Sequence, residues 1–225
     1  MLNIEVFSDV ICPWCFIGKR RLDRVLTTEI GSNVVLRWRP FMLYPNAPQT
    51  GWNRFEFLQR RFGSSADQSH IPKRLRQEAE EVNLELRYDL IQYTPNTMLA
   101  HRLMEWCYLH FDVLEEVQPG TSNSAQHQLA DLLFEGYFCR GLNVGDIDVL
   151  IRLAEEAEIA DRDLREYLLS SGGTQEVNKQ LARAPDLDIV GVPSYLMQRR
   201  FLLPGAQSED TIAKIITRAK IKFAS

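Results

Sequence analysis

The chain has 225 residues, of which 45% are apolar, and its net charge is −4. This length supports one substantial core, or a core with an inserted subdomain, and the nearly balanced charge does not favour a nucleic-acid partner. No run of about 18 apolar residues is present, so we expect no membrane-spanning helix. The N-terminus has no basic region, and Glu5 and Asp9 interrupt its apolar stretch. It therefore does not look like a secretory signal, and we expect a cytoplasmic protein.

The first elements follow a strand–helix–strand pattern. Residues 3–7 and 34–39 are predicted strands, and residues 16–27 are a predicted helix between them. This spacing suits a right-handed crossover between parallel strands. The helix also carries four basic residues, for which we expect a solvent-exposed face: Lys19, Arg20, Arg21 and Arg24.

The middle of the chain is predicted to be almost entirely helical, and the end returns to strands. Caps and apolar periodicity predict the following helices: 55–62, 72–82, 98–111, 122–139, one from Asp146 or Asp148 to about Ala157, and 161–169. A helix over 174–184, turns leading into a strand within 188–197, a strand over 200–203 and a helix over 208–222 follow. We expect residues 1–47 and 172–225 to form one α/β domain, with residues 48–171 as a helical insertion.

Two cysteines separated by two residues lie between the first strand and the first helix. Cys12-Pro13-Trp14-Cys15 at such a junction is typical of a redox site. A helix N-terminus stabilises a thiolate, so Cys12 is the expected nucleophile. Pro13 suits a first helical turn, and Cys15 lies about one turn later, where it could resolve a mixed disulfide.

A zinc site is the alternative interpretation of such a pair. Zinc would need two further ligands, usually in a second close pair. The remaining cysteines, Cys107 and Cys139, are far apart within predicted helices, so we expect no metal.

Gly191-Val192-Pro193 is the second notable segment, because a proline before a strand can be cis at modest cost. If it lies opposite the cysteines, the Val192 backbone could pair with an extended substrate near the sulfur. An ordinary trans proline at a strand start explains the sequence equally well.

Several segments resemble one known family and occur in order along almost the whole chain. They are residues 7–15, Trp38-Arg39-Pro40-Phe41, Pro95-Asn96-Thr97, Ala100-His101-Arg102-Leu103, Gly191-Val192-Pro193 and Gly205-Ala206-Gln207. The chain is similar to the DsbA-like branch of thioredoxin-fold proteins, and within it to the FrnE-like cytosolic subfamily. The resemblance implies a thioredoxin-like α/β fold with a large all-helical insertion. It also implies a dithiol–disulfide oxidoreductase with Cys12 as nucleophile, Cys15 as resolving residue and Pro193 in the cis form.

The chain departs from that family at one position. Thioredoxins and DsbA carry a buried acid six residues before the first cysteine, where this chain has Val6. Glu5 should point to the opposite face of its strand. Acid-assisted deprotonation of Cys15 would therefore need Asp9 or water.

Three further residues are candidates for substrate contacts. Pro13 and Trp14 belong to the motif, and Trp14 should be partly exposed. His101 could line the groove over the cysteines, or it could be hydrogen-bonded in a domain junction. Asn96 or Thr97 is expected to cap a helix.

We thus predict a thiol–disulfide oxidoreductase or isomerase that acts on protein or small-molecule disulfides or thiols. We expect no cofactor besides the dithiol, with glutathione as a possible co-substrate. The alternative enzyme class is a glutathione-dependent isomerase or transferase, similar to the kappa-class and 2-hydroxychromene-2-carboxylate isomerase type. In those proteins a serine typically replaces the first cysteine. A chaperone-like protein with an idle dithiol is the non-enzymatic alternative.

Overall fold

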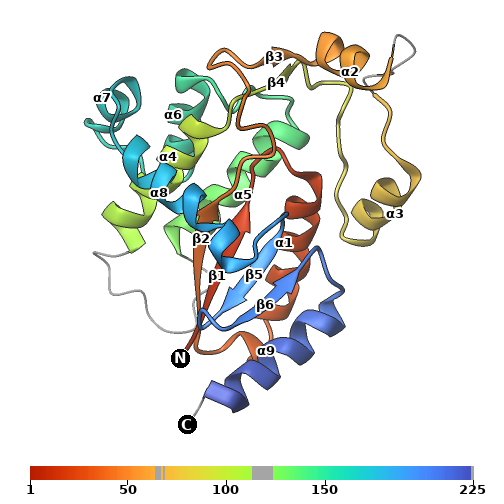
Figure 1. The fold of residues 1–225 in the computed structure, drawn as a ribbon, viewed down its shortest axis with the longest axis vertical. Helices are drawn as coiled ribbons and strands as arrows, with labels where there is room; N and C mark the ends of the chain where they lie inside the picture. The colour runs from red at the N-terminus through yellow and green to blue at the C-terminus, as the bar shows by residue number, and fades with distance from the viewer. Residues whose placement is uncertain (64–66, 68, 113–123, 224–225) are drawn as a thin grey trace.

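The computed structural model describes residues 1–63, 67, 69–112 and 124–223. The chain begins with β1 (Leu2–Ser8), α1 (Pro13–Leu26) and β2 (Val34–Pro40). β2 pairs with β1 in parallel over the full length of both strands. The predicted crossover is therefore present, with α1 as the connecting helix (Figure 1).

The C-terminal elements complete the same sheet. They are β5 (Ser194–Met197), β6 (Phe201–Pro204) and α9 (Glu209–Phe223). The strand order is β2-β1-β5-β6, and both β5 and β6 pair antiparallel with their neighbours. The two ends of the sequence thus form one mixed sheet, as expected for a thioredoxin-like fold.

The segment between β2 and the last strands is mainly helical. Its elements are β3 (Trp52–Asn53), α2 (Arg54–Phe62), α3 (Lys73–Glu81), β4 (Tyr93–Thr94), α4 (Met98–Cys107), the π-helix η2 (Tyr108–Asp112), α5 (Ala125–Phe138), α6 (Ile147–Glu156), α7 (Leu164–Leu169), α8 (Thr174–Arg183) and the 3-10 helix η3 (Pro185–Leu187); a further 3-10 helix, η1 (Glu29–Gly31), follows α1. The antiparallel pair β3–β4 is not predicted, because two-residue strands are too short to show alternation. Whether residues 48–171 form a separate domain stays a prediction.

The ends of two predicted helices differ from the structure. The continuous helix expected over 98–111 ends at Cys107 and continues as the π-helix η2. The helix expected from 161 begins at Leu164, because the Asp161 carboxylate accepts the backbone N–H of Leu164 and caps that end. The predicted start of the helix over 122–139 lies outside the described residues. None of the described helices is long and apolar enough to cross a membrane.

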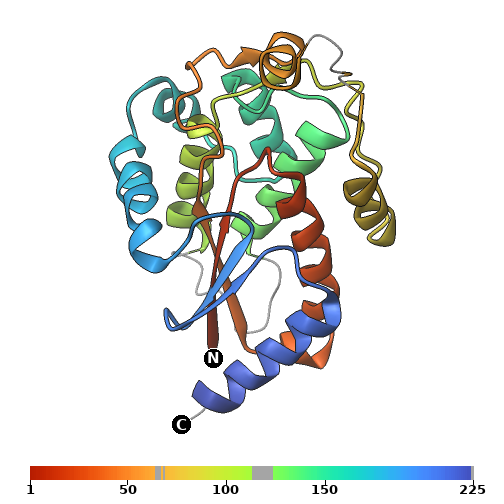
Figure 2. The same cartoon turned by 45° about the vertical axis from the view of Figure 1, so that its right-hand side comes forward.

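The sheet is covered on both faces. Ile4 and Val6 of β1 pack in the larger core together with Phe16 of α1 and residues of α9. Phe7 and Leu196 point to the other face, where they form a smaller core with residues around η3. Figures 1 and 2 show α1 and α9 side by side on one flank, with α8 on the opposite flank.

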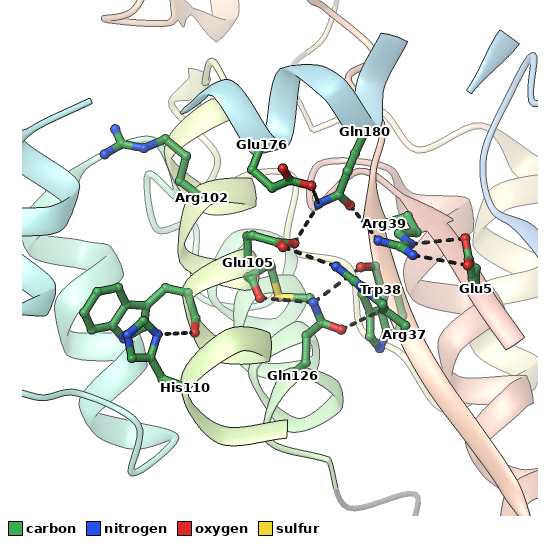
Figure 3. A network of polar contacts seen from close by, with 12 residues as sticks. Glu5, Arg37, Trp38, Arg39, Arg102, Glu105, His110, Gln126, Glu176 and Gln180 are labelled. Atoms are coloured by element: carbon green, nitrogen blue, oxygen red, sulfur yellow. Dashed lines mark hydrogen bonds and ion pairs between the residues drawn. The ribbon is translucent and has the colours of Figure 1, made fainter. Parts of the chain in front are cut away.

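A buried polar network ties the edge strand β2 to the helices (Figure 3). Gln126 of α5 accepts the Trp38 backbone N–H at 2.7 Å and donates to the Trp38 carbonyl at 3.3 Å. The Glu105 carboxylate is 3% exposed and accepts from Arg37 at 3.2 Å and from Gln180 of α8 at 2.9 Å. An exposed sheet edge presents unpaired backbone groups, and here the Gln126 side chain pairs with both backbone groups of Trp38.

The basic face of α1 is not solvated as predicted. Lys19 and Arg21 are 3% and 6% exposed. Lys19 pairs with Asp23 at 2.8 Å and with Asp131 of α5 at 3.3 Å, while Arg21 pairs with Glu78 of α3. The prediction is wrong for these two residues because α3 and α5 pack against α1 and supply carboxylates to it.

Candidate active site

Cys12 is the N-cap residue of α1, with extended backbone angles (φ −92°, ψ 112°), and Pro13 occupies the first helical turn. The backbone N–H groups of Cys15 and Phe16 donate to the Cys12 carbonyl at 3.0 and 3.3 Å. The Cys12 sulfur is thus at the positive end of a 14-residue helix, where a thiolate is favoured. Both Cys12 and Cys15 are free thiols in this structure.

The Val192–Pro193 peptide is cis and lies next to Cys12. The Cys12 thiol donates to the Val192 carbonyl, with 3.7 Å between sulfur and oxygen. The cis form and the position opposite the cysteines are therefore confirmed.

Gly18 allows α1 to approach the strand that follows Pro193. A Cβ atom at position 18 would lie 2.4 Å from the Tyr195 hydroxyl oxygen and 3.1 Å from Pro193 Cγ. A larger residue would push α1 away from β5, and with it the Cys12 sulfur from the Val192 carbonyl.

Cys15 lies behind Cys12 and is 1% exposed. Burial raises the pKa of the Cys15 thiol well above its usual range, and the neighbouring Cys12 raises it further. The Ser8 hydroxyl and the Asp9 backbone oppose this shift in part. Cys15 is therefore a thiol at neutral pH, and it must lose a proton before it can attack a disulfide.

Glu5 and Asp9 are the two carboxylates near the motif that could assist the deprotonation of Cys15. Glu5 pairs with Arg39 at 3.1 Å on the other face of the sheet, and although burial would raise its pKa, Arg39 and Arg199 lower it. Asp9 is completely buried, and its Oδ2 accepts the Leu43 N–H at 2.7 Å. Asp9 Oδ1 has no hydrogen-bond partner among the described residues and lies 3.6 Å from His101 Nε2. Asp9, three residues before Cys12, is therefore better placed than Glu5.

The predicted substrate-contact residues occupy different environments. Pro13 and Trp14 are half-buried. The Arg74 guanidinium lies over the Trp14 side chain, 5.5 Å from the centre of its ring. His101 is 5% exposed and hydrogen-bonds the Phe41 carbonyl at 2.9 Å. This position favours the junction interpretation of His101 over direct contact with a substrate.

Helix α4 starts with a local cap. The Asn96 side chain accepts the Met98 N–H at 3.0 Å and donates to the Ala47 carbonyl at 2.7 Å. Thr97 is the N-cap residue of α4 but its side chain makes no capping bond, so the Asn96 side chain provides the hydrogen bond to this helix start from one position earlier.

A pocket of about 670 Å³ lies beside the cysteine motif. Ile11 and Pro13 form one wall, and α2 and α3 supply Phe57 and Leu75. Tyr88 belongs to the same lining, and burial raises the pKa of its hydroxyl, so it is neutral. The sequence did not reveal this pocket, because its walls come from several stretches of the chain that are far apart in the sequence. Within the described parts of the chain, no group of three or more His, Cys, Asp or Glu residues could hold a metal ion.

Residues 3–217 match the family described as the DSBA-like thioredoxin domain. The chain belongs to this family. It is therefore a member of a family of thiol–disulfide oxidoreductases with a thioredoxin fold.

The individual relatives have low sequence identity to this chain. The uncharacterized protein YwbO of Bacillus subtilis (strain 168) is 26% identical over 219 residues, which cover 96% of each chain. Among solved structures, a "probable DsbA oxidoreductase" of Streptomyces coelicolor has a TM-score of 0.76 at 22% identity, covering 97% of this chain and 90% of that one.

Two further solved structures share the fold at 12% identity. The cytosolic disulfide reductase DsbM of Pseudomonas aeruginosa, solved with GSH, has a TM-score of 0.66 and coverage of 97% and 99%. A 2-hydroxychromene-2-carboxylate isomerase has a TM-score of 0.65 and coverage of 99% and 98%.

Proposed function

We propose that this protein is a thiol–disulfide oxidoreductase or isomerase that works through the Cys12-Pro13-Trp14-Cys15 dithiol. The observation that carries the proposal is the position of Cys12, whose sulfur lies at the N-terminus of α1 and 3.7 Å from the Val192 carbonyl. Cys15 follows one helical turn later. A nucleophile, a resolving thiol and a backbone acceptor for substrate thus come together in one place.

The first step is attack by the Cys12 thiolate on a substrate disulfide. The new bond joins the Cys12 sulfur to one substrate sulfur, the substrate S–S bond breaks, and the other substrate sulfur leaves as a thiolate. The helix N-terminus stabilises the attacking thiolate. An extended substrate could pair with the backbone next to Val192, where the thiol now donates.

The second step requires Cys15 to lose its proton. The Cys15 thiolate attacks the Cys12 sulfur, a Cys12–Cys15 disulfide forms, and the second substrate thiolate leaves. The substrate gains two electrons and the protein loses two. A thiol such as glutathione would return the dithiol to its reduced form, so no other cofactor is needed. The reverse sequence oxidises a substrate dithiol.

We further propose a cytoplasmic location, in which the dithiol would be kept reduced between turnovers. The likeness to a cytosolic disulfide reductase solved with GSH supports this location and a role for glutathione. The direction of net electron flow depends on the reduction potential of the pair.

Cysteine replacements test the mechanism. Cys12→Ser should abolish disulfide exchange, whereas Cys15→Ser should accumulate mixed disulfides on Cys12, which mass spectrometry of trapped adducts would detect. Full exchange activity in the Cys12→Ser protein would show that the mechanism is wrong.

A glutathione-dependent isomerase remains the second candidate, because a 2-hydroxychromene-2-carboxylate isomerase shares the fold over 99% of this chain. The presence of both cysteines argues against it. Glutathione-dependent isomerisation that persists in a Cys12→Ser, Cys15→Ser double variant would favour this class over disulfide exchange.

A further inference from the structure

Arg54, at the start of α2, forms no ion pair with any residue that the structure describes. Its guanidinium lies 4.9 Å from the centre of the Tyr88 ring. Its Nε is buried and has no hydrogen-bond partner among the described residues. Other inward-facing arginines are matched: Arg39 pairs with Glu5, and Arg102 donates to four backbone carbonyls. A buried donor without an acceptor is costly, so a ligand that brings an acceptor to Arg54 would be favoured here.

Arg54 and the cysteine motif border the same pocket. Pro13 and Ile11 form the wall next to the reactive sulfur, and Arg54 and Tyr88 belong to the same lining. Tyr88 lies at the Arg54 end of the pocket, because the Arg54 guanidinium is 4.9 Å from the centre of its ring. Cys12 itself is 3% exposed, but its two chain neighbours Ile11 and Pro13 border the pocket, so a molecule bound here lies beside the cysteine motif as well as beside Arg54.

The walls between these two ends are apolar and aromatic. Tyr44, Phe57, Leu58, Leu75 and Tyr137 line this part of the pocket. The Tyr137 hydroxyl already donates to a backbone carbonyl at 3.1 Å. A ligand with a polar central part would lose hydrogen bonds to water against such walls, whereas an aromatic ring in that position would stack on the aromatic side chains.

Two titratable side chains, Asp67 and His70, also border the pocket, and both are exposed to solvent. Because both are exposed, neither is a buried counterion for Arg54. Its volume of about 670 Å³ falls within the roughly 300–1,000 Å³ of small-molecule sites.

We propose that this pocket selects small aromatic disulfides that carry a carboxylate. The carboxylate binds the Arg54 guanidinium, the ring lies between the aromatic walls, and the disulfide sulfur faces Cys12. The guanidinium suits this role because its planar N–H groups match the two oxygens of a carboxylate. This inference rests on the proposed disulfide exchange and adds the substrate class. Attack follows the same balance as above: the Cys12–sulfur bond forms, the aryl S–S bond breaks, and an aryl thiolate leaves.

Two aromatic disulfides differ in the feature that Arg54 would recognise. Dithiobis(nitrobenzoate) has a carboxylate on each ring, whereas dithiodipyridine has none. The reduced protein is mixed with an excess of either disulfide in a stopped-flow instrument, and release of the coloured aryl thiolate gives the rate constant of the Cys12 attack. The dependence of the observed rate constant on disulfide concentration separates the affinity for the disulfide from the limiting rate constant of attack.

In Arg54→Gln the second-order rate constant for dithiobis(nitrobenzoate) should fall about 10- to 100-fold, the loss expected for a hydrogen bond to a charged group. The rate with dithiodipyridine should stay within about twofold, which also shows that the variant is folded. The control is Arg60→Gln, which removes the same charge from the exposed face of the same helix. It should leave both rates unchanged, because steering by a distant surface charge is weak and screened by salt.

An equal loss with both disulfides, or an equal effect of Arg60→Gln, would overturn the carboxylate assignment while leaving disulfide exchange intact. If the wild-type protein released no aryl thiolate from either compound through Cys12, the proposed function itself would fail.

Discussion

Gly18→Ala should destabilise this protein, although the same change in an ordinary helix interior stabilises by about 1 kcal/mol. The new Cβ would lie 2.4 Å from the Tyr195 hydroxyl, whereas ordinary contacts begin at 3.4 Å, so the two groups must separate by about 1 Å. Tyr195 is 2% exposed and cannot swing aside. Overpacking of this kind costs about 1–3 kcal/mol. With the upper value and the helix gain subtracted, we expect a net loss of about 2 kcal/mol.

Tyr195→Phe provides the matched test. The Tyr195 hydroxyl is buried and has no hydrogen-bond partner among the described residues, so its removal alone should be nearly neutral. In the Tyr195→Phe background, the contacts left for the Gly18→Ala Cβ are Pro193 Cγ at 3.1 Å and Ala206 Cβ at 3.6 Å, so the change should cost little or stabilise. The expected coupling between the two sites is about 2 kcal/mol.

Urea unfolding of the four proteins, followed by circular dichroism, measures this coupling through the midpoints at a constant m-value. The rate of Cys12 alkylation in the same proteins reports whether α1 has moved away from Val192. The reasoning would be refuted if Gly18→Ala stabilised the wild-type protein, or if it had the same effect in both backgrounds.

Three further predictions concern buried titratable side chains. Burial lowers the pKa of His127 below 6.5, and its Nδ1 accepts the Trp38 indole N–H at 3.2 Å. The unfolded chain thus binds a proton at His127 that the folded state does not, so the free energy of unfolding should be constant above pH 6.5 and decrease below it. In His127→Gln this decrease should be smaller, as measured by urea midpoints between about pH 5 and 8. Asp9→Asn should slow the second aryl thiolate release by about 10²-fold and leave the first unchanged in stopped-flow traces, and equal slowing of both phases would contradict a role in deprotonating Cys15. Lys19→Gln should cost about 1.5–3 kcal/mol in urea unfolding, because it removes a 3% exposed ammonium and its charged hydrogen bond to Asp23, whereas Arg24→Gln, at a more exposed ion pair, should cost less than about 1 kcal/mol; equal costs would contradict the burial argument.

Local patterns in the sequence predicted the parts of the site that lie next to one another along the chain. The strand before Cys12, the helix after it and the proline before β5 all carry signals within a few residues. The remaining parts depend on contacts between distant segments. The charges of Lys19 and Arg21 have the spacing of a solvated face, and only the packing of α3 and α5 buries them.

The pocket could not be predicted from the sequence for the same reason. Arg54 and Tyr88 are 34 positions apart in the sequence, in a segment whose strands β3 and β4 are two residues long. No periodicity marks such a pair. Gly18 likewise looks like an ordinary helical glycine until β5 places the Tyr195 hydroxyl against it.

The redox titration of the Cys12–Cys15 pair tests the central claim most directly. The protein is equilibrated in glutathione buffers, free thiols are alkylated, and the linked peptides are identified by mass spectrometry, with Cys12→Ser as the blank. We predict one two-electron transition, changing tenfold per roughly 30 mV, that joins Cys12 to Cys15 and leaves the fully buried Cys107 reduced. A potential near about −270 mV would indicate a reductase, and one between about −180 and −120 mV an isomerase or oxidant. If no Cys12–Cys15 disulfide formed at any buffer ratio, the account of this protein as a disulfide oxidoreductase would be contradicted.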